Sequence, residues 1–388
     1  MARQNAAEEE GRSAERGRAL FTAAPRLTAW FAASKRSFPW REERTPYKVL
    51  VSETMLQQTR IEAVMKYYDR FMKSFPTLKA LAEAPEDLVM KHWEGLGYYS
   101  RARNLKKCAE ICAERYDGEL PQSFAELIRL PGLGPYSAGA IASLCYDEPV
   151  PAVDGNVLRV LSRFFGDDRD VRLPEVKREA EEVITKVLVG HSAHGFPFRG
   201  SCHGLKAVTD EVRPSVSPSV FNEALMELGE TLCGPKGKPQ CEACPWREAC
   251  RAHAEGREEE LPFRSAGAAR TVEEKTVWIF LCGGRVALEK RPDSGMLRGL
   301  YGFPMTEGTV PDAVAAEALL REKGIMPLRV SPLGNAGHVF THREWHMTGY
   351  LAETAEELPE LTYVSAEELT NDYALPSAFR YYKNALLS

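Results

Sequence analysis

The spacing of apolar residues divides the chain into a long helical part and a shorter part with strand patterns. Apolar side chains recur at helical intervals in LTAWFAASK, VLVSETMLQQTRIEAVMKYYDRFM and FAELIRL, so residues 25–251 are expected to be mostly helical. Thr45-Pro46 indicates a helix start, because threonine caps helices and proline fits the first helical position. Further on, TVWIFLC and RVALEKR alternate like strands, with Gly283-Gly284 as a hairpin turn, and DAVAAEALLREKG follows as a helix.

These patterns predict a multidomain protein with an all-α domain followed by a smaller α+β domain. Residues 1–24 are polar and mixed in charge, without the apolar centre of a signal peptide, so we expect a disordered tail on a cytoplasmic protein. The helical domain is expected over residues 25–254, a linker over 255–274 and the α+β domain over 275–388. No apolar run approaches the roughly 18 residues that suggest a membrane span.

The net charge of the chain does not identify its binding partner. The net charge is −5, and residues 271–388 carry all of it, with 11 basic and 16 acidic residues. A neutral helical domain can still present a basic face, so composition neither supports nor excludes a nucleic-acid partner.

Four of the nine cysteines form a compact run with the spacing C-x7-C-x2-C-x5-C. The run is made of Cys233, Cys241, Cys244 and Cys250. Zinc more often uses two paired C-x2-C knuckles, whereas one run of four thiolates suits a [4Fe–4S] cluster. Zinc and four unrelated buried thiols are the alternatives. The scattered cysteines read as ordinary thiols in a cytosolic chain: Cys108, Cys112, Cys145, Cys202 and Cys282.

Two carboxylates are candidates for acid–base chemistry. Glu53 lies on the helix that begins at Pro46, on or beside its apolar stripe, where burial would raise its pKa as a general acid requires. From spacing alone, an exposed glutamate at the edge of the stripe is the simpler interpretation. Asp154 precedes the helix NVLRVLSRFF and can be a plain N-cap, or it can face a cleft and stabilise positive charge on a sugar.

The string LPGLGPY, from Leu130 to Tyr136, is a glycine-rich turn that opens a helix. Backbone N–H groups in such a turn have no helical partner, and with the helix dipole they can hold a phosphate without reading sequence. Taken alone, the turn is equally typical of a plain helical hairpin.

These features occur together and in the order of one family. The segment from Pro46 to Cys250 resembles the helix–hairpin–helix glycosylases, and within them the MutY-type adenine glycosylases. The matching strings are PYKVLVSETMLQQTR, EGLGYYSRARNL, LPGLGPYSAGAIASL, VDGNVLRVLSR, FNEALMELGETLC and CEACPWREAC.

The resemblance implies roles for particular residues. Glu53 would protonate adenine N7, Asp154 would stabilise the oxocarbenium-like sugar, Tyr136 would lie beside that sugar, and Asn156 would support the site. The residues expected at the DNA and the 8-oxoguanine are Leu56, Gln58, Thr59, Tyr98, Gly132 and Gly134. An enzyme that extrudes adenine needs wedges and a pocket, and Gln58 and Tyr98 would be the wedges.

Tyr136 bears on the reaction type. Similar bifunctional enzymes of the endonuclease III kind carry a lysine at this hairpin position, and a lysine amine can form a Schiff base with the sugar and cleave the strand. Tyrosine cannot, so we expect hydrolysis of the glycosidic bond with little or no lyase activity.

The sequence departs from the family pattern in two places. The first cysteine gap is x7 where the family usually has x6, and the extra residue falls in the loop CGPKGKPQC. The stretch from His191 to Ser219 is also longer than the family pattern. Its His191, His194, Cys202 and His203 suggest a second metal, but a solvated loop is the simpler interpretation.

The part after the linker resembles the MutT-like (Nudix) domain of MutY-type enzymes. A working Nudix helix needs several glutamates for Mg²⁺, and EALLREKGI from Glu317 has Ala318 and Arg321 where two of them belong, so no nucleotide hydrolysis is expected. The string HVFTHREWHM resembles the lesion-recognition loop of the family, so 8-oxoguanine would contact Phe340-Thr341-His342. An ordinary strand over FTHREWHM is the alternative.

The function expected is therefore that of a monomeric, monofunctional glycosylase with one [4Fe–4S] cluster. Its substrate would be double-stranded DNA with adenine opposite 8-oxoguanine or guanine, and no membrane partner is expected. The alternatives are a related glycosylase with lyase activity, a non-catalytic iron–sulfur DNA-binding protein and a nucleotide hydrolase.

Overall fold

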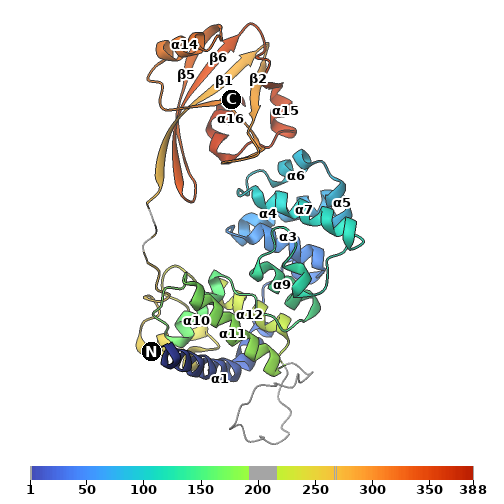
Figure 1. Cartoon of the computed structure of the whole chain (residues 1–388), viewed down its shortest axis with the longest axis vertical. Helices are drawn as coiled ribbons and strands as arrows, with labels where there is room; N and C mark the ends of the chain where they lie inside the picture. Colours follow the sequence, from blue (N-terminus) through green and yellow to red (C-terminus); the bar gives the residue numbers. More distant parts are fainter. Residues whose placement is uncertain (1, 192–215, 266, 268, 388) are drawn as a thin grey trace, which may run out of the picture. The chain divides into compact units, whose positions relative to one another are not determined.

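The computed structural model describes residues 2–191, 216–265, 267 and 269–387 (Figure 1). Contacts between residues divide the chain into two compact units. The first unit combines Met1–Gln57 with Ile111–Ala266, and the second combines Gln58–Glu110 with Gly267–Ser388. The stretch 192–215, which includes most of the predicted insertion and three of its four candidate metal ligands, lies outside the described residues.

The described part of the first unit is helical. Its elements are α1 (Ala2–Ser34), α2 (Pro39–Glu42), α3 (Pro46–Leu56), α8 (Phe124–Leu127), α9 (Pro135–Tyr146), α10 (Gly155–Phe165), α11 (Pro174–His191), α12 (Pro218–Glu230), η1 (Cys241–Ala243), η2 (Arg247–Ala249) and α13 (Arg251–Glu255). Side chains cap several of these helices as the sequence suggests. Thr45 accepts a hydrogen bond from the Lys48 N–H with Pro46 at the first helical position, and Ser217 caps α12 ahead of Pro218.

The expected disordered tail over residues 1–24 is wrong, because α1 begins at Ala2. Leu20 and Ala24 are fully buried and belong to the core that α1 shares with α11 and α12. Arg16 donates to Asp167 at 2.7 Å and to Glu179 at 3.1 Å. The polar segment is therefore held by partners more than 150 positions away, which local composition does not reveal.

Packing within the first unit centres on α12. It contacts α1, α9 and α10, and Phe221, Leu225 and Leu228 are buried in the same cluster as Val157 and Leu161 of α10. Gly229 allows close approach to α10, since a Cβ there would lie 2.8 Å from that of Asn156. This packing positions the ends of α3, α9 and α10, where the candidate catalytic residues lie.

The second unit joins a helical segment to a mixed sheet. Its elements are α4 (Ile61–Ser74), α5 (Leu78–Glu83), α6 (Glu86–Trp93), α7 (Ser100–Arg115, which crosses the unit boundary), β1 (Thr271–Cys282), β2 (Arg285–Lys290), β3 (Tyr301–Gly302), β4 (Met305–Glu307), α14 (Ala313–Glu322), β5 (Pro327–Val339), β6 (Arg343–Thr354), β7 (Thr362–Val364), α15 (Ala366–Asn371), η3 (Ser377–Phe379) and α16 (Arg380–Leu387).

The strands lie in the order β3-β2-β1-β6-β5, with β4 added to β1 and β7 to β2. The β1–β6 pair is parallel, whereas the β1–β2 and β5–β6 pairs are antiparallel. The predicted hairpin is confirmed: Cys282 pairs with Arg285 across Gly283 and Gly284, both at positive φ.

Both faces of the sheet are covered. Successive residues of β1 point to opposite sides, so the strand contributes to a core on each face. Val277 and Ile279 join the core formed with Phe379 and Tyr382, near α16. Trp278 and Phe280 join the core on the other face, with Leu320 of α14. Figure 1 shows α14 and α16 beside this sheet.

The predicted fold class, a helical part followed by a smaller α+β part, is confirmed. Two boundaries differ from the expectation. Strand β1 begins at Thr271, inside the predicted linker. In addition, residues 58–110 belong by their contacts to the same unit as the α+β part, and not to the unit that holds the rest of the helical domain. Among the described helices, none is both long and apolar enough to cross a membrane.

Candidate functional site

Glu53 is buried, so the simpler expectation of an exposed glutamate is wrong. The residue lies in the last turns of α3 and is 7% exposed. Its Oε2 accepts a 2.7 Å hydrogen bond from the Tyr136 hydroxyl. Burial raises the pKa of Glu53 to about 7, the Tyr136 bond opposes that rise, and the neighbouring carboxylates of Asp154 and Glu223 add to it. A carboxyl group with this pKa can donate a proton near neutral pH.

Tyr136 lies in the first turn of α9, directly after the glycine-rich turn. Burial and the carboxylates of Glu53 and Asp154 raise its pKa well above the usual value of 10, so the side chain remains a neutral phenol. Its hydroxyl is also 3.5 Å from the sulfur of Met226 on α12. Tyr136 therefore connects α3, α9 and α12 at one point.

Asp154 is the N-cap of α10, as one of the two interpretations predicted, and its carboxylate also acts on Glu53. Its Oδ1 accepts a 2.8 Å bond from the Val157 N–H at the start of α10. Its Oδ2 accepts a 2.9 Å bond from the Asn156 amide, which also donates to Glu230 at 2.7 Å. Burial nevertheless raises the pKa of Asp154, against these hydrogen bonds. Its charge acts on both Glu53 and Tyr136, so the three groups form one buried polar cluster.

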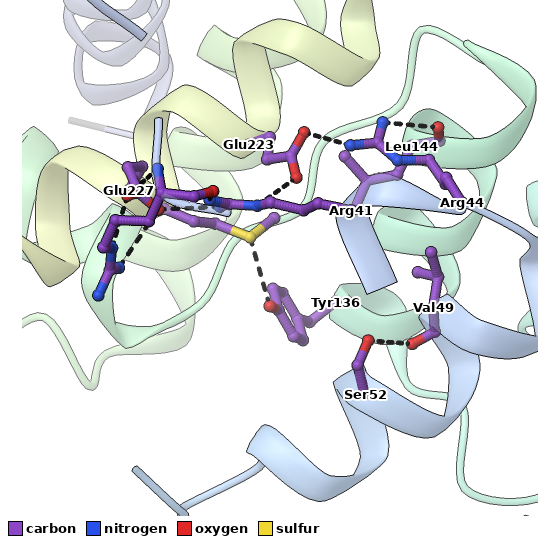
Figure 2. A network of polar contacts seen from close by, with 10 residues as sticks. Arg41, Arg44, Val49, Ser52, Tyr136, Leu144, Glu223 and Glu227 are labelled. Atoms are coloured by element: carbon purple, nitrogen blue, oxygen red, sulfur yellow. Dashed lines mark hydrogen bonds and ion pairs between the residues drawn. The ribbon is translucent and has the colours of Figure 1, made fainter. Parts of the chain in front are cut away.

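A network of ion pairs borders this cluster, and our sequence reasoning missed it. Arg41 donates to Glu223 at 2.7 Å and to Glu227 at 2.9 Å, and Arg36 donates to Glu227 at 2.6 Å. Figure 2 shows Arg41 between the two glutamates, with the hydrogen bond from Tyr136 to the sulfur below them. Burial alone would raise the pKa of Glu227, but the bonds from Arg36 and Arg41 outweigh it and lower that pKa. The pair of glutamates at i and i+4 on the apolar helix FNEALMELGE is the signal that could have indicated buried charges.

Hydrogen bonds connect Asp154 to the cysteine run. Arg159 donates to Asn156 Oδ1 at 2.8 Å and to the carbonyl oxygen of Cys233 at 2.8 Å. Arg163, one turn later on α10, donates to the Cys233 sulfur at 3.3 Å and to its carbonyl oxygen at 3.2 Å. The chain Asp154–Asn156–Arg159–Cys233 is therefore continuous within the first unit, and both arginines are less than a tenth exposed.

The four clustered cysteines are free thiols that lie close enough to affect one another. Burial and the charges of the other three raise the pKa of Cys244 to about 12. The x7 gap does not remove Cys233 from the group, because it acts on Cys241, Cys244 and Cys250. Four thiolates this close need positive charge to offset their repulsion, which a metal centre supplies.

The spacing of these thiols tests which metal centre they fit. Within the described chain, no three of the four sulfurs lie inside 4.8 Å of one another. A single zinc ion with bonds of about 2.3 Å brings tetrahedral sulfurs to roughly 3.8 Å. The donor set is thus wider than one zinc ion requires. A separate group within 4.8 Å combines Cys241 with His253 and Glu258.

The turn LPGLGPY has the geometry expected for a phosphate contact. Gly132 is at φ +81°, Gly134 is the N-cap of α9, and both are exposed. Among the described residues, no acceptor takes the N–H group of either glycine. Leu56, expected at the DNA, is half-buried at the last position of α3.

The predicted wedge residues share a rare backbone conformation in the second unit. Gln58 is at φ +58° and Tyr98 at φ +47°, a region that L side chains enter only at a cost. The Tyr98 side chain is 47% exposed. Arg101 lies over the Tyr98 ring at 5.5 Å and donates to the Thr59 hydroxyl at 3.2 Å, so it connects two of the expected lesion contacts.

Phe340, Thr341 and His342 form the turn between β5 and β6, so the alternative of a continuous strand over FTHREWHM is wrong. Phe340 packs against Trp345 with ring centroids 4.8 Å apart, while Thr341 and His342 are exposed. Within the second unit the Tyr98 hydroxyl lies 3.0 Å from the Thr341 hydroxyl. Two residues expected at the lesion thus meet although they are far apart in sequence.

Helix α14 occupies the place of the Nudix helix in the sequence. Arg321 donates to Glu317 at 2.8 Å, so the glutamate that begins EALLREKGI is paired with a cation. The helix therefore lacks acids at Ala318 and Arg321, and its Glu317 is already engaged by a cation.

Comparisons with known proteins divide the chain in the same order. Residues 51–186 match the model of the HhH-GPD superfamily base excision DNA repair protein, and residues 276–385 match that of the NUDIX domain. The adenine DNA glycosylase of Arabidopsis thaliana is 35% identical over 318 residues, which cover 72% of this chain and 46% of that protein, less than half its length. The adenine DNA glycosylase of Mus musculus is 31% identical over 423 residues, which cover 92% of this chain and 77% of that protein. Among solved structures, that of a thermostable thymine-DNA glycosylase is 24% identical in sequence, with a TM-score of 0.49. The match covers 62% of this chain and 98% of the glycosylase chain.

Proposed function

Because this chain belongs to the adenine DNA glycosylase family, we propose that it hydrolyses the glycosidic bond of adenine mispaired with 8-oxoguanine or guanine in duplex DNA. It acts as a monomer and without strand cleavage. The observation that carries the proposal is the buried group formed by Glu53, Tyr136 and Asp154. It combines an acid with a pKa of about 7, a neutral phenol and a second carboxylate in one cluster.

In this mechanism Glu53 donates its proton to N7 of the extruded adenine. Protonation makes the base a better leaving group, and the bond between C1′ and N9 breaks with its electron pair going to the base. The sugar is left with oxocarbenium character, which the Asp154 carboxylate stabilises. Asn156 keeps Asp154 oriented. Glu53, now ionised, accepts a proton from the water that attacks C1′, so the acid is restored.

Tyr136 supports a monofunctional reaction. The position beside Glu53 holds a phenol, which has no amine to form a Schiff base with the sugar. Reaction with abasic or substrate DNA in the presence of borohydride is expected to give no covalent enzyme–DNA band. A strong trapped band would contradict this part of the proposal.

Specificity for 8-oxoguanine is assigned to residues of the second unit. Gln58 and Tyr98, both at strained backbone positions, would enter the base stack, and Thr59 would contact the edge of the lesion. The exposed Thr341 and His342 next to Phe340 would contact the lesion from the β5–β6 turn. We infer that the α+β part recognises the lesion and does not hydrolyse nucleotides.

Cys233, Cys241, Cys244 and Cys250 are the residues that would hold a [4Fe–4S] cluster, since their spacing is wider than a single zinc ion needs. When bound, such a cluster would order the loop around η1 and η2 and not take part in the bond cleavage. The cluster is checked by the brown colour of the purified protein and by its iron and sulfide content. Zinc in place of iron would contradict it.

A panel of duplexes tests the function. The purified protein is expected to release adenine mainly from adenine opposite 8-oxoguanine, less from adenine opposite guanine, and to leave thymine glycol untouched. Release of an oxidised pyrimidine would favour the related glycosylase with lyase activity, and binding without release would favour a non-catalytic DNA-binding protein.

A further inference from the structure

The second unit contains a cavity of about 780 Å³ that the proposed reaction does not fully explain. Tyr98, Phe340 and Thr341 line it, and so do three arginines: Arg103, Arg270 and Arg298. The aromatic residues are those assigned to the lesion base. The arginines have no role yet, and their charge indicates an anionic ligand.

One wall of the cavity is the loop before β3, where the sign of φ alternates. Gly295 is at φ +81°, Leu297 at φ +55° and Gly299 at φ +62°, whereas the two residues between them are outside this region. Leucine adopts a positive φ only under strain. Alternation of this kind turns successive N–H groups toward one side and makes a concave anion site. Among the described residues, no acceptor takes the N–H groups of positions 296–298.

Two arginines lie beside this loop. Arg298 is exposed, and within the described chain no carboxylate lies in ion-pair distance of it. The Arg103 side chain is 12% exposed and pairs with Glu86 through Nε at 2.9 Å. Its Nη2 is buried without a hydrogen-bond partner and lies 3.3 Å from where a Cβ on Gly299 would be. The Asp293 carboxylate faces the same glycine, so it offsets part of this positive charge.

We propose that the backbone of residues 295–299, together with Arg103 and Arg298, binds a phosphate of the DNA strand that carries the lesion. This inference rests on the proposed function, because it takes the strand from the lesion contacts of Tyr98 and Thr341 in the same cavity. Contacts to phosphate fix the register of a protein on the duplex without reading bases. The subsite holds the strand while the wedge residues enter the stack.

Arg298→Gln tests the charge contribution, with Arg321→Gln as the matched control. Arg321 lies in the same α+β part, is also exposed and does not line the cavity. Affinity is measured against salt for a duplex with a non-hydrolysable 2′-fluoro adenosine opposite 8-oxoguanine. Loss of one phosphate contact is expected to reduce the slope of log K against log[salt] by about 0.9, and thus to weaken binding about eightfold at 0.1 M salt. Arg321→Gln is expected to match the wild type. Equal slopes for all three proteins would overturn the proposal.

Gly295→Ala tests the backbone contribution, with Gly308→Ala as its control. Both glycines have positive φ, +81° and +82°, and neither has an atom within 4 Å of the added Cβ. The two substitutions therefore impose similar backbone strain, but only Gly295 lines the cavity. Weaker duplex binding by Gly295→Ala alone is expected, and equal loss in both variants would contradict a role for this loop.

Two further measurements distinguish failure of the proposed function from failure of the phosphate subsite, and DNA from a free nucleotide as its ligand. Wild-type protein that binds the duplex but releases no adenine from the hydrolysable substrate would disprove the proposed function, while the slopes above would still test the subsite. Free 8-oxo-dGMP supplies the same phosphate chemistry without a strand. Tight binding of this nucleotide that Arg298→Gln abolishes, with duplex affinity unchanged, would overturn DNA as the occupant.

Discussion

The burial of Glu53, opposed by the hydrogen bond from Tyr136, sets the pH range in which adenine release is possible. Burial raises the pKa of Glu53 from 4.5 to about 7. At pH 7 about half of the carboxyl groups are then protonated, compared with roughly 0.3% for an unperturbed glutamate. Release should therefore decline above about pH 7, tenfold for each further pH unit.

Tyr136→Phe is the perturbation that tests this account. The hydroxyl donates to Glu53 at 2.7 Å and stabilises the ionised carboxylate. A hydrogen bond to a charged group contributes about 1.5–3 kcal/mol, and one pKa unit corresponds to about 1.36 kcal/mol. Loss of the bond should thus raise the pKa of Glu53 by roughly one to two units and move the declining limb from about pH 7 to about pH 8–9.

The assay is single-turnover release of adenine between about pH 5 and about pH 10. The position of the limb is the readout, because the variant can also lower the maximum rate. Tyr146→Phe is the control, since its hydroxyl donates to the carbonyl of Leu120 and does not touch Glu53. A limb that stays near pH 7 in Tyr136→Phe, or moves to lower pH, would refute the reasoning.

Three other predictions follow from the structure. The pKa of Glu53 is higher in the folded than in the unfolded chain, so its ionisation costs the wild type stability as pH rises from 4.5 to about 7. Glu53→Gln lacks this cost, and its unfolding free energy relative to the wild type should therefore be about 3 kcal/mol higher at pH 8 than at pH 4. Denaturant titrations at both pH values check this, and a gain that does not depend on pH would count against it. Leu20→Ala should lose about 2–5 kcal/mol of unfolding free energy, which a disordered tail would not. Cys233→Ser should abolish the visible absorbance of the purified protein, whereas Cys145→Ser should keep it.

The sequence predicts local features of this fold well. Thr45-Pro46, the Gly283-Gly284 hairpin and the helix after Asp312 depend on residues within a few positions, and each is present. The tail over 1–24 was predicted wrongly because Leu20 is buried by helices far along the chain. Burial of that kind depends on tertiary packing, which local polarity does not report.

The candidate site shows the same division. The sequence indicates Glu53, Tyr136 and Asp154 as separate residues, and spacing alone even favoured an exposed Glu53. Their meeting in one cluster requires the packing of α3, α9 and α10. Arg41, which comes from α2, pairs with two glutamates of α12 and had no local signal at all.

The most direct test of the account compares wild-type protein with Glu53→Gln on a duplex with adenine opposite 8-oxoguanine. Adenine release under single-turnover conditions and duplex affinity are measured for both proteins. We predict that the wild type releases adenine and that the variant binds the duplex as tightly but releases none. Full release by Glu53→Gln would contradict the assignment of the acid, and absence of release by the wild type would contradict the proposed function.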